Sequence, residues 1–325
     1  MMFLQFLILI AGFVFLIKGA DFFVDGSAAL ARMFKVSPLV IGLTIVALGT
    51  SLPELAVSTS AAVQGANEIA LSNVVGSNLF NLLGVLGICA IIHSVPVETE
   101  ILRRDFPFSI FITLVMLFGS VSPALLSGSF ARSPMLSEAG MVSRILGLAL
   151  LTLFVLYLVY IVYDAKKKPQ PDDGAEPMPL WRCLLLIVLG VGLIIAGGQC
   201  VVQSAKKIAL AFGMTETLVG LTIVALGTSL PELVTSIVAA HKGETELAVG
   251  NVVGSNIFNI LFILGVSSSI HPVSVNAASV YDMLILVAVS LFCWLFCATG
   301  KRVSRIEGIL MVLMYAAAMT FAVLR

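Results

Sequence analysis

Two stretches of this chain are identical over fourteen residues, and both lie within long apolar segments. The sequence GLTIVALGTSLPEL runs from Gly42 to Leu55 and again from Gly220 to Leu233. A second pair of blocks, NVVGSNLFN at Asn73 to Asn81 and NVVGSNIFN at Asn251 to Asn259, keeps the same separation of 178 residues. Two blocks that share one offset indicate an internal duplication. The fold must therefore consist of two related halves.

The segments around these blocks are apolar enough to require lipid as their surroundings. Of the 325 residues, 59% are hydrophobic and 11% are charged, and the mean hydropathy is +1.11. A water-soluble fold could not cover so much apolar surface with so few charges. The formal net charge of zero gives no reason to expect nucleic acid as a partner. We therefore expect an integral membrane protein in contact with the lipid bilayer.

Apolar runs of about 20 residues, the length that crosses a bilayer as a helix, occur ten times. The expected fold class is all-α, a polytopic membrane protein with ten transmembrane helices. The second and seventh runs differ from the others because they carry Gly, Thr, Ser, Pro and Glu in mid-span. The expected spans cover residues 3–30, 37–63, 69–92, 105–122, 143–163, 179–200, 214–240, 247–270, 278–298 and 304–323.

The first pair of repeated blocks falls in the second and seventh spans, so the two copies cross the bilayer in opposite directions. Inverted-topology repeats are typical of secondary transporters, whose sites lie near the midplane where the repeats meet. We predict a first five-helix repeat at 1–163, a cytoplasmic linker at 164–179 and an inverted second five-helix repeat at 180–325. The linker reads DAKKKPQPDDGAEPMP, which is typical of a flexible connector.

The Lys and Arg residues of the connections predict the orientation, because they concentrate on the cytoplasmic side. One set of alternate connections holds twelve of them, and the other set, with the terminal Arg325, holds five. This asymmetry places the first set inside and both termini outside. The expected location is the cell (inner) membrane.

Each of the two unusual spans contains a proline followed by a glutamate. Pro53 lacks the N–H that would bond the carbonyl of Gly49, and Pro231 lacks the N–H that would bond the carbonyl of Gly227. In hydrocarbon, a freed carbonyl is costly unless a neighbouring helix, a water molecule or a bound cation replaces the lost donor. Breaks at equivalent positions of two repeats are the best sequence pointer to a binding site.

Glu54 and Glu232 are the only acids within the repeated apolar blocks. An acid at mid-bilayer costs about 2.5 to 3.5 kcal/mol on translocon scales, and neither has a Lys or Arg within helical reach. A protonated structural glutamate is one interpretation. We favour a pair that neutralises a divalent cation.

Further oxygen-bearing side chains share helical faces with these acids or form a stripe on the following helix. Single hydroxyls could instead bond their own helix, and the stripe could join helices. Because the set repeats in both halves, we expect it to bind the ion or line its path. Its members are Thr50, Ser51, Thr228, Ser229, Asn73, Ser77, Asn81, Asn251, Ser255 and Asn259.

The donors in this set are all oxygen atoms, without His or Cys. Hard oxygen ligands with two negative charges suit calcium or magnesium better than zinc or copper. Neutral oxygens beside shared carboxylates could hold sodium once the divalent ion leaves, which gives a physical route to exchange.

At these residues the chain resembles the calcium/cation antiporter family, and specifically its prokaryotic sodium/calcium exchangers. The family's paired motifs, GTSLPE followed by GSNxxN, stand at Gly49 to Glu54 and Gly76 to Asn81, and again at Gly227 to Glu232 and Gly254 to Asn259. The resemblance extends over essentially the whole chain. It implies transport by alternating access, with calcium and sodium as the transported ions and no cofactor.

The resemblance also implies a ligand set. Glu54 and Glu232, with the carbonyls of Thr50 and Thr228, would hold calcium, and Asn81 and Asn259 would lie between two sodium sites. Some relatives, including potassium-dependent ones, have Asp where this chain has Asn259. The sodium sites would use Ala47, Thr50, Ser51, Glu54 and Ser77 in one half, and Ala225, Thr228, Ser229, Glu232 and Ser255 in the other.

Three other functions remain to be weighed against a calcium/sodium antiporter. A proton-coupled or potassium-assisted exchanger is the nearest, because a buried glutamate can carry a proton. An intramembrane hydrolase is disfavoured because His93, His241 and His271 all lie at span ends. A channel is disfavoured because two fixed carboxylates would release a divalent ion slowly. The sequence leaves the oligomeric state open.

Overall fold

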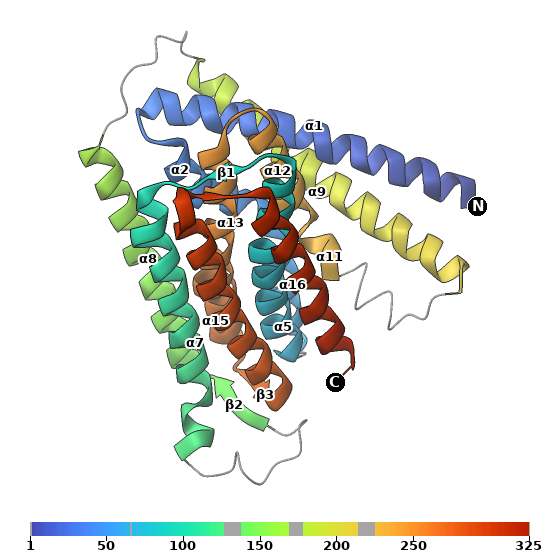
Figure 1. Ribbon diagram of the computed structural model, residues 1–325. Helices are drawn as coiled ribbons and strands as arrows, with labels where there is room; N and C mark the ends of the chain where they lie inside the picture. The colour runs from blue at the N-terminus through green and yellow to red at the C-terminus, as the bar shows by residue number, and fades with distance from the viewer. Residues whose placement is uncertain (1, 66, 127–137, 169–177, 214–224, 325) are drawn as a thin grey trace.

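The structure, a computed structural model, is a bundle of long helices. It describes residues 2–65, 67–126, 138–168, 178–213 and 225–324 (Figure 1). The helices are α1 (Met2–Phe34), α2 (Pro38–Ile41), α3 (Ala47–Thr50), α4 (Leu52–Val63), α5 (Asn67–Leu79), α6 (Leu86–Ile92), α7 (Phe106–Leu126), α8 (Arg144–Lys167), α9 (Leu180–Ala211), α11 (Ala225–Thr228), α12 (Leu230–His241), α13 (Thr245–Phe258), α14 (Leu264–Ile270), α15 (Ala277–Ala298) and α16 (Arg305–Leu324).

Seven of the described helical segments are long and apolar enough to cross a membrane, and the bent pair Pro38–Thr50 and Leu52–Val63 could form an eighth span. The expected span 105–122 corresponds to α7. The first part of the expected span 214–240 lies outside the described residues, and α11 and α12 form the rest. π-Helical turns join several of the shorter helices, at Gly42–Val46, Phe80–Val85, Ile101–Asp105 and Asn259–Ile263.

The sixth expected span, 179–200, ends too early. The observed helix α9 continues to Ala211 and includes Lys206 and Lys207. Hydropathy predicts which residues can face lipid. The length of a helix is set instead by how far its backbone hydrogen bonds continue. The polar last turns of α9 therefore remain helical although they carry charge.

Burial separates central helices from outer ones. In Thr245–Ile270, 94% of the most apolar stretch is buried inside the protein, compared with 22% in Arg144–Lys167. The outer helices expose apolar side chains such as Ile145, Val188 and Ile306. Apolar outer faces are what a helix needs where lipid surrounds it.

Helices α1 and α9 lie side by side along one side of the bundle, and small residues bring their backbones together (Figure 1). A Cβ atom on Gly19 would lie 2.8 Å from the carbonyl oxygen of Gly190. One on Gly197 would lie 2.7 Å from the carbonyl oxygen of Gly12. Gly190 and Gly197 follow Gly12 and Gly19 by the repeat offset of 178, so the pair is packed with the same symmetry as the sequence. Glycine contacts of this kind permit close helix packing in membranes.

Two short antiparallel strand pairs connect loops of the two halves, a detail that the all-α prediction did not include. The strands are β1 (Val95–Pro96), β2 (Glu138–Val142), β3 (Val273–Asn276) and β4 (Arg302–Val303). Val95 pairs with Val303, and Val273, which follows Val95 by 178 residues, pairs with Val142. The two ribbons lie at opposite ends of the bundle (Figure 1). Each end is thus closed by one strand from each half.

We predict that Gly190→Leu destabilises the protein. A Cβ atom there would lie 2.6 Å from the backbone nitrogen of Phe23 and 2.8 Å from the carbonyl oxygen of Gly19. Overpacking costs about 1 to 3 kcal/mol, and backbone neighbours cannot yield as side chains do. The measurement is the midpoint of thermal unfolding in detergent. Gly192→Leu is the matched control, because nothing lies within 4 Å of a Cβ at Gly192 on the same helix. Equal unfolding midpoints for the two variants would contradict the packing described for α1 and α9.

Candidate functional site

Both prolines start a new helix after a break in the chain direction. Ser51 lies between α3 and α4 with ψ near 8°, and the two helical segments meet at a bend of 50°. Ser229 lies between α11 and α12 with the same ψ. Pro53 and Pro231 then occupy the first turns of α4 and α12, where a missing N–H costs nothing. The repeated motif thus produces the same break in both halves.

The two glutamates lie in the first turns of these helices and are fully buried. The hydroxyl of Ser229 donates to Oε1 of Glu54 at 2.9 Å, and the hydroxyl of Ser51 donates to Oε1 of Glu232 at 2.9 Å. Each carboxylate is therefore held by a serine of the other half. The acids lie where the helix breaks of the two halves meet, and both are buried in the protein interior.

Ser77 and Thr50 add oxygens beside these acids. The Ser77 hydroxyl lies 3.4 Å from Oε1 of Glu54 and 3.1 Å from the Ser229 hydroxyl. The single hydroxyl proton of Thr50 has two acceptors within reach, the carbonyl of Val46 on its own helix at 3.1 Å and Oδ1 of Asn251 at 3.0 Å. The Thr50 hydroxyl is 3.4 Å from that of Ser255. Bonding within the helix and contact across the halves therefore occur together at this threonine.

The remaining members of the predicted set are placed less fully. Ala47 is buried at the start of α3, and its carbonyl accepts the backbone N–H of Ser51. Ala225 is the first residue of α11, and the residues before it lie outside the described part of the chain. Thr228 ends α11 and is partly buried.

Asn73 and Asn251 hold the broken helices in place. The amide nitrogen of Asn73 donates to the Ser58 hydroxyl at 2.9 Å and to the backbone carbonyl of Glu54 at 3.3 Å. Asn251 makes the equivalent bonds to the Ser236 hydroxyl at 3.0 Å and to the carbonyl of Glu232 at 3.4 Å. Because these amides donate to the backbone carbonyl of each glutamate, they hold the backbone from which each carboxylate side chain extends.

Sequence reasoning missed two further asparagines, Asn78 and Asn256, which lie off the predicted polar stripe. Both are buried, and each bonds the backbone carbonyl of the other at 3.2 and 3.4 Å. Asn81 donates to Oδ1 of Asn256 at 3.2 Å, and Asn259 donates to Oδ1 of Asn78 at 3.0 Å. The one signal available was the exact offset of 178 between them.

Within the described part of the chain, four buried side-chain oxygens near the acids have no hydrogen-bond partner. They are Oε2 of Glu54, Oε2 of Glu232, Oδ1 of Asn81 and Oδ1 of Asn259. Buried polar atoms are normally paired, because an unpaired acceptor costs free energy. Among the described ion pairs, none joins either glutamate to a Lys or Arg, and the histidines lie at helix ends. These four unpartnered atoms are all oxygens that could serve as ligands of a cation, and no described Lys or Arg pairs with the two acids among them.

A cavity of about 380 Å³ borders both helix breaks. Its walls come from α9, including Gly198 and Gln203, and from the two broken helices, including Pro53, Pro231 and Thr228. Thr228 precedes Ser229, which bonds Glu54. The cavity therefore reaches the immediate neighbourhood of the acids.

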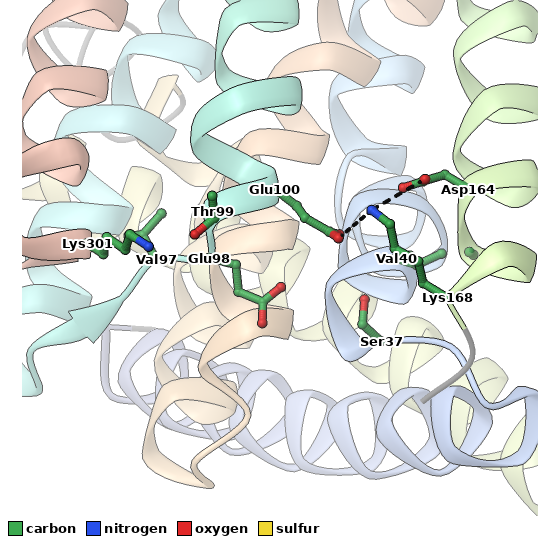
Figure 2. Close-up of a pocket in the computed structure, with 10 residues that line it drawn as sticks. Ser37, Val40, Val97, Glu98, Thr99, Glu100, Asp164, Lys168 and Lys301 are labelled. Atoms are coloured by element: carbon green, nitrogen blue, oxygen red, sulfur yellow. Dashed lines mark hydrogen bonds and ion pairs between the residues drawn. The ribbon is translucent and has the colours of Figure 1, made fainter. Parts of the chain in front are cut away.

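A larger cavity of about 580 Å³ lies elsewhere, between the start of α2, the end of α8 and the loop before α7. Figure 2 shows three of its charged side chains paired with one another: Lys168 bonds Glu100 at 2.7 Å and lies 3.5 Å from Asp164. The bond to Glu100 raises the pKa of Lys168, which keeps this cation charged. Because Lys168, Glu100 and Asp164 already pair with one another and none of the cavity's lining residues belongs to the repeated blocks, we place the functional site at the buried glutamates.

The sequence matches the family model described as sodium/calcium exchanger protein over residues 4–163 and 183–324. Among similar proteins, the putative antiporter CaxA of Alkalimonas amylolytica is 38% identical, covering 94% of each chain. The inner membrane protein YrbG of Escherichia coli K12 is 35% identical, covering 88% of each chain.

A solved structure of the sodium-calcium exchanger NCX_Mj, soaked with sodium and without calcium, superposes on this chain with a TM-score of 0.83. The two share 32% identity, and the match covers 98% of this chain and 99% of the other. The predicted fold class, a polytopic all-helical membrane protein with ten spans in two inverted repeats, is thereby confirmed. The protein is a transporter of cations, including calcium, and not an enzyme. This chain belongs to the sodium/calcium exchanger family.

Proposed function

We propose that this protein is an antiporter that exchanges calcium for sodium by alternating access, at one site built on Glu54 and Glu232. The observation that carries the proposal is the pair of fully buried carboxylates. Each has one oxygen hydrogen-bonded by a serine of the other half and one oxygen without a partner among the residues that the structure describes. Two buried anions without a cationic partner are costly, because desolvation removes their hydration. A bound divalent cation would offset both charges at once.

The chemistry of the donors supports calcium as that ion. Carboxylate, amide and hydroxyl oxygens are the ligands that calcium takes in flexible sets of six to eight. Asn81 and Asn259 add two buried amide oxygens that lack partners. Neither His nor Cys, the ligands that softer transition metals favour, belongs to this set.

Sodium coupling is supported by the way in which the oxygens divide into two equivalent groups. One group is Ala47, Thr50, Ser51, Glu54 and Ser77, and the other is Ala225, Thr228, Ser229, Glu232 and Ser255. Each group has one carboxylate, which matches the single charge of sodium. Two sodium ions would therefore replace one calcium ion at the acids with the same charge, so the two ions compete for one site.

Alternating access would use the two helix breaks and the outer pair α1 and α9. The cavity that borders Pro53, Pro231 and Thr228 lies between the breaks and α9, so a displacement of α9 would open or close it. Glycine contacts between α1 and α9 allow the two helices to move as one body. We take 1–163 and 180–325 as the two repeats and 164–179 as a cytoplasmic linker.

We further propose that the protein lies in the inner membrane with both termini outside. The excess of Lys and Arg in one set of connections supports this orientation. The relative YrbG, an inner membrane protein, supports the location.

A proton-coupled exchanger is the alternative, and ion substitution distinguishes it. In proteoliposomes loaded with sodium and clamped at equal pH on both sides, we expect rapid uptake of radioactive calcium into vesicles containing the protein. Replacement of internal sodium by choline should abolish this uptake. Uptake that needs a pH gradient and ignores sodium would reject sodium coupling.

Replacement of either acid by its amide should abolish calcium exchange. Glu54→Gln and Glu232→Gln each leave one negative charge against two positive charges, and loss of one partner of a buried charge pair costs about 3 to 5 kcal/mol, or at least two orders of magnitude in rate or affinity. The measurement is sodium-driven calcium uptake at matched protein density.

Glu100→Gln is the matched control for these variants, because Glu100 pairs with Lys168 at the other cavity. We expect it to transport calcium within about twofold of the parent, since exposed ion pairs contribute little. Near-normal exchange by either Gln variant at the buried acids, or loss of exchange in the control, would refute the assignment of the site.

Asn259→Asp should alter cation preference while leaving the fold intact. A third carboxylate beside the two acids adds a charge that a proton or a second cation must offset. We expect calcium uptake to acquire a dependence on pH or potassium, which uptake measurements between about pH 6 and 9, with and without potassium, would detect.

Asn276→Asp is the control for this substitution, because Asn276 caps α15 and aspartate caps helices equally well. It should leave the ion profile unchanged. An unaltered profile for Asn259→Asp would show that position 259 has only a structural role.

A further inference from the structure

Four asparagine side chains form a connected hydrogen-bond network where α5 and α13 meet. All four are buried, and every one of their amide nitrogens donates a hydrogen bond. Asn78 and Asn256 connect to each other's backbone, and Asn259 and Asn81 connect to the amide oxygens of Asn78 and Asn256. The network is symmetric, because each bond of one half has its counterpart in the other.

The direction of every amide in this network follows from a backbone carbonyl. A carbonyl oxygen can only accept, so the group of Asn78 that faces the carbonyl of Asn256 must be its nitrogen. The oxygen of Asn78 then faces Asn259, at 3.0 Å from its nitrogen, and Asn259 must donate. The same sequence of bonds runs from the carbonyl of Asn78 through Asn256 to Asn81.

The chain of donors determines which atoms of Asn81 and Asn259 remain available. Their nitrogens are used, and their oxygens are the atoms left buried without a partner. A rotated amide would present N–H groups in the same place. Such groups carry positive partial charge and cannot bind a cation, whereas a carbonyl oxygen can.

Both oxygens lie in the region of the acids. Asn81 is one helical turn after Ser77, whose hydroxyl is 3.4 Å from the Glu54 carboxylate. The π-helical turn that begins at Asn259 packs against α4, which carries Glu54, and the turn that contains Asn81 packs against α12, which carries Glu232. Each of these amides therefore belongs to a turn that packs against a helix carrying one of the acids.

We infer that Asn78 and Asn256 are positioning residues that hold the amides of Asn259 and Asn81 with their oxygens available to the transported cation. This inference rests on the proposed function, because it assigns a role in binding the same ion. The nitrogen and the oxygen of each positioning side chain both take part in hydrogen bonds within the network.

A double-mutant cycle separates positioning from packing. With Asn259 in place, Asn78→Ala frees the amide to rotate, and we expect the calcium concentration for half-maximal uptake to rise about tenfold, with a smaller change in maximal rate. With Asn259→Asp, both terminal atoms at that position are oxygens, so either orientation presents an oxygen to the cation, and the Asn78 oxygen has no donor left there to hold. In that background Asn78→Ala should change half-saturation by about twofold or less.

The cycle is measured in proteoliposomes as sodium-driven uptake of radioactive calcium at one pH, for the parent protein, both single variants and the double variant. An equal loss of affinity in the two backgrounds would overturn the inference, because a packing defect does not depend on which atoms stand at position 259. Absence of calcium exchange by the parent protein would instead overturn the proposed function.

The symmetric cycle, Asn256→Ala with and without Asn81→Asp, tests the same inference if Asn78→Ala does not fold. Monodisperse elution and an unfolding midpoint near that of the parent identify folded variants. We expect the same rescue by aspartate in this half, and its absence in folded protein would contradict the positioning role.

Discussion

The structure depends on holding two carboxylates in an interior that would otherwise expel them. Each glutamate is fully buried and takes its hydroxyl donor from the opposite half, Ser229 for Glu54 and Ser51 for Glu232. Neither half could supply this arrangement alone, because each would leave its own acid without that donor. The cost of burying the acids therefore couples the two repeats, and the same cost makes a cation favourable at their junction.

Much of this arrangement could be predicted from the sequence, because the internal duplication indicates two equivalent helix breaks and their opposite directions. Identical blocks that contain a proline and an acid predict identical helix breaks, and the odd number of spans between them predicts opposite directions. These features are local, so each block carries its own evidence. Helical spacing also identified Ser51 and Ser229, but it grouped each with the acid of its own half, whereas each hydroxyl bonds the acid of the other half.

The asparagine network could not be predicted from either block, because its bonds run between the halves and end on backbone carbonyls. Helical periodicity grouped Asn73, Ser77 and Asn81 on one stripe and left Asn78 aside. In the structure Asn73 holds the backbone at Glu54, whereas Asn78 directs Asn259. Which atom of an amide faces an ion depends on a partner in the other half of the chain, and side-chain spacing along one helix contains no information about it.

The symmetry of the site does not extend to the helix ends. This difference matters for which membrane face the site opens to. Lys242 bonds Asp25 at 2.7 Å and lies 3.4 Å from Asp21, whereas the positions related by the offset of 178 are the neutral Gln64, Gln203 and Gln199. A site with equal halves gives no preference for one membrane face over the other. Any preference must come from positions at which the halves differ. An exposed ion pair contributes about 1 kcal/mol at most, which shifts a two-state equilibrium by about fivefold. Unequal helix ends can therefore bias which side the site faces without changing how it binds an ion.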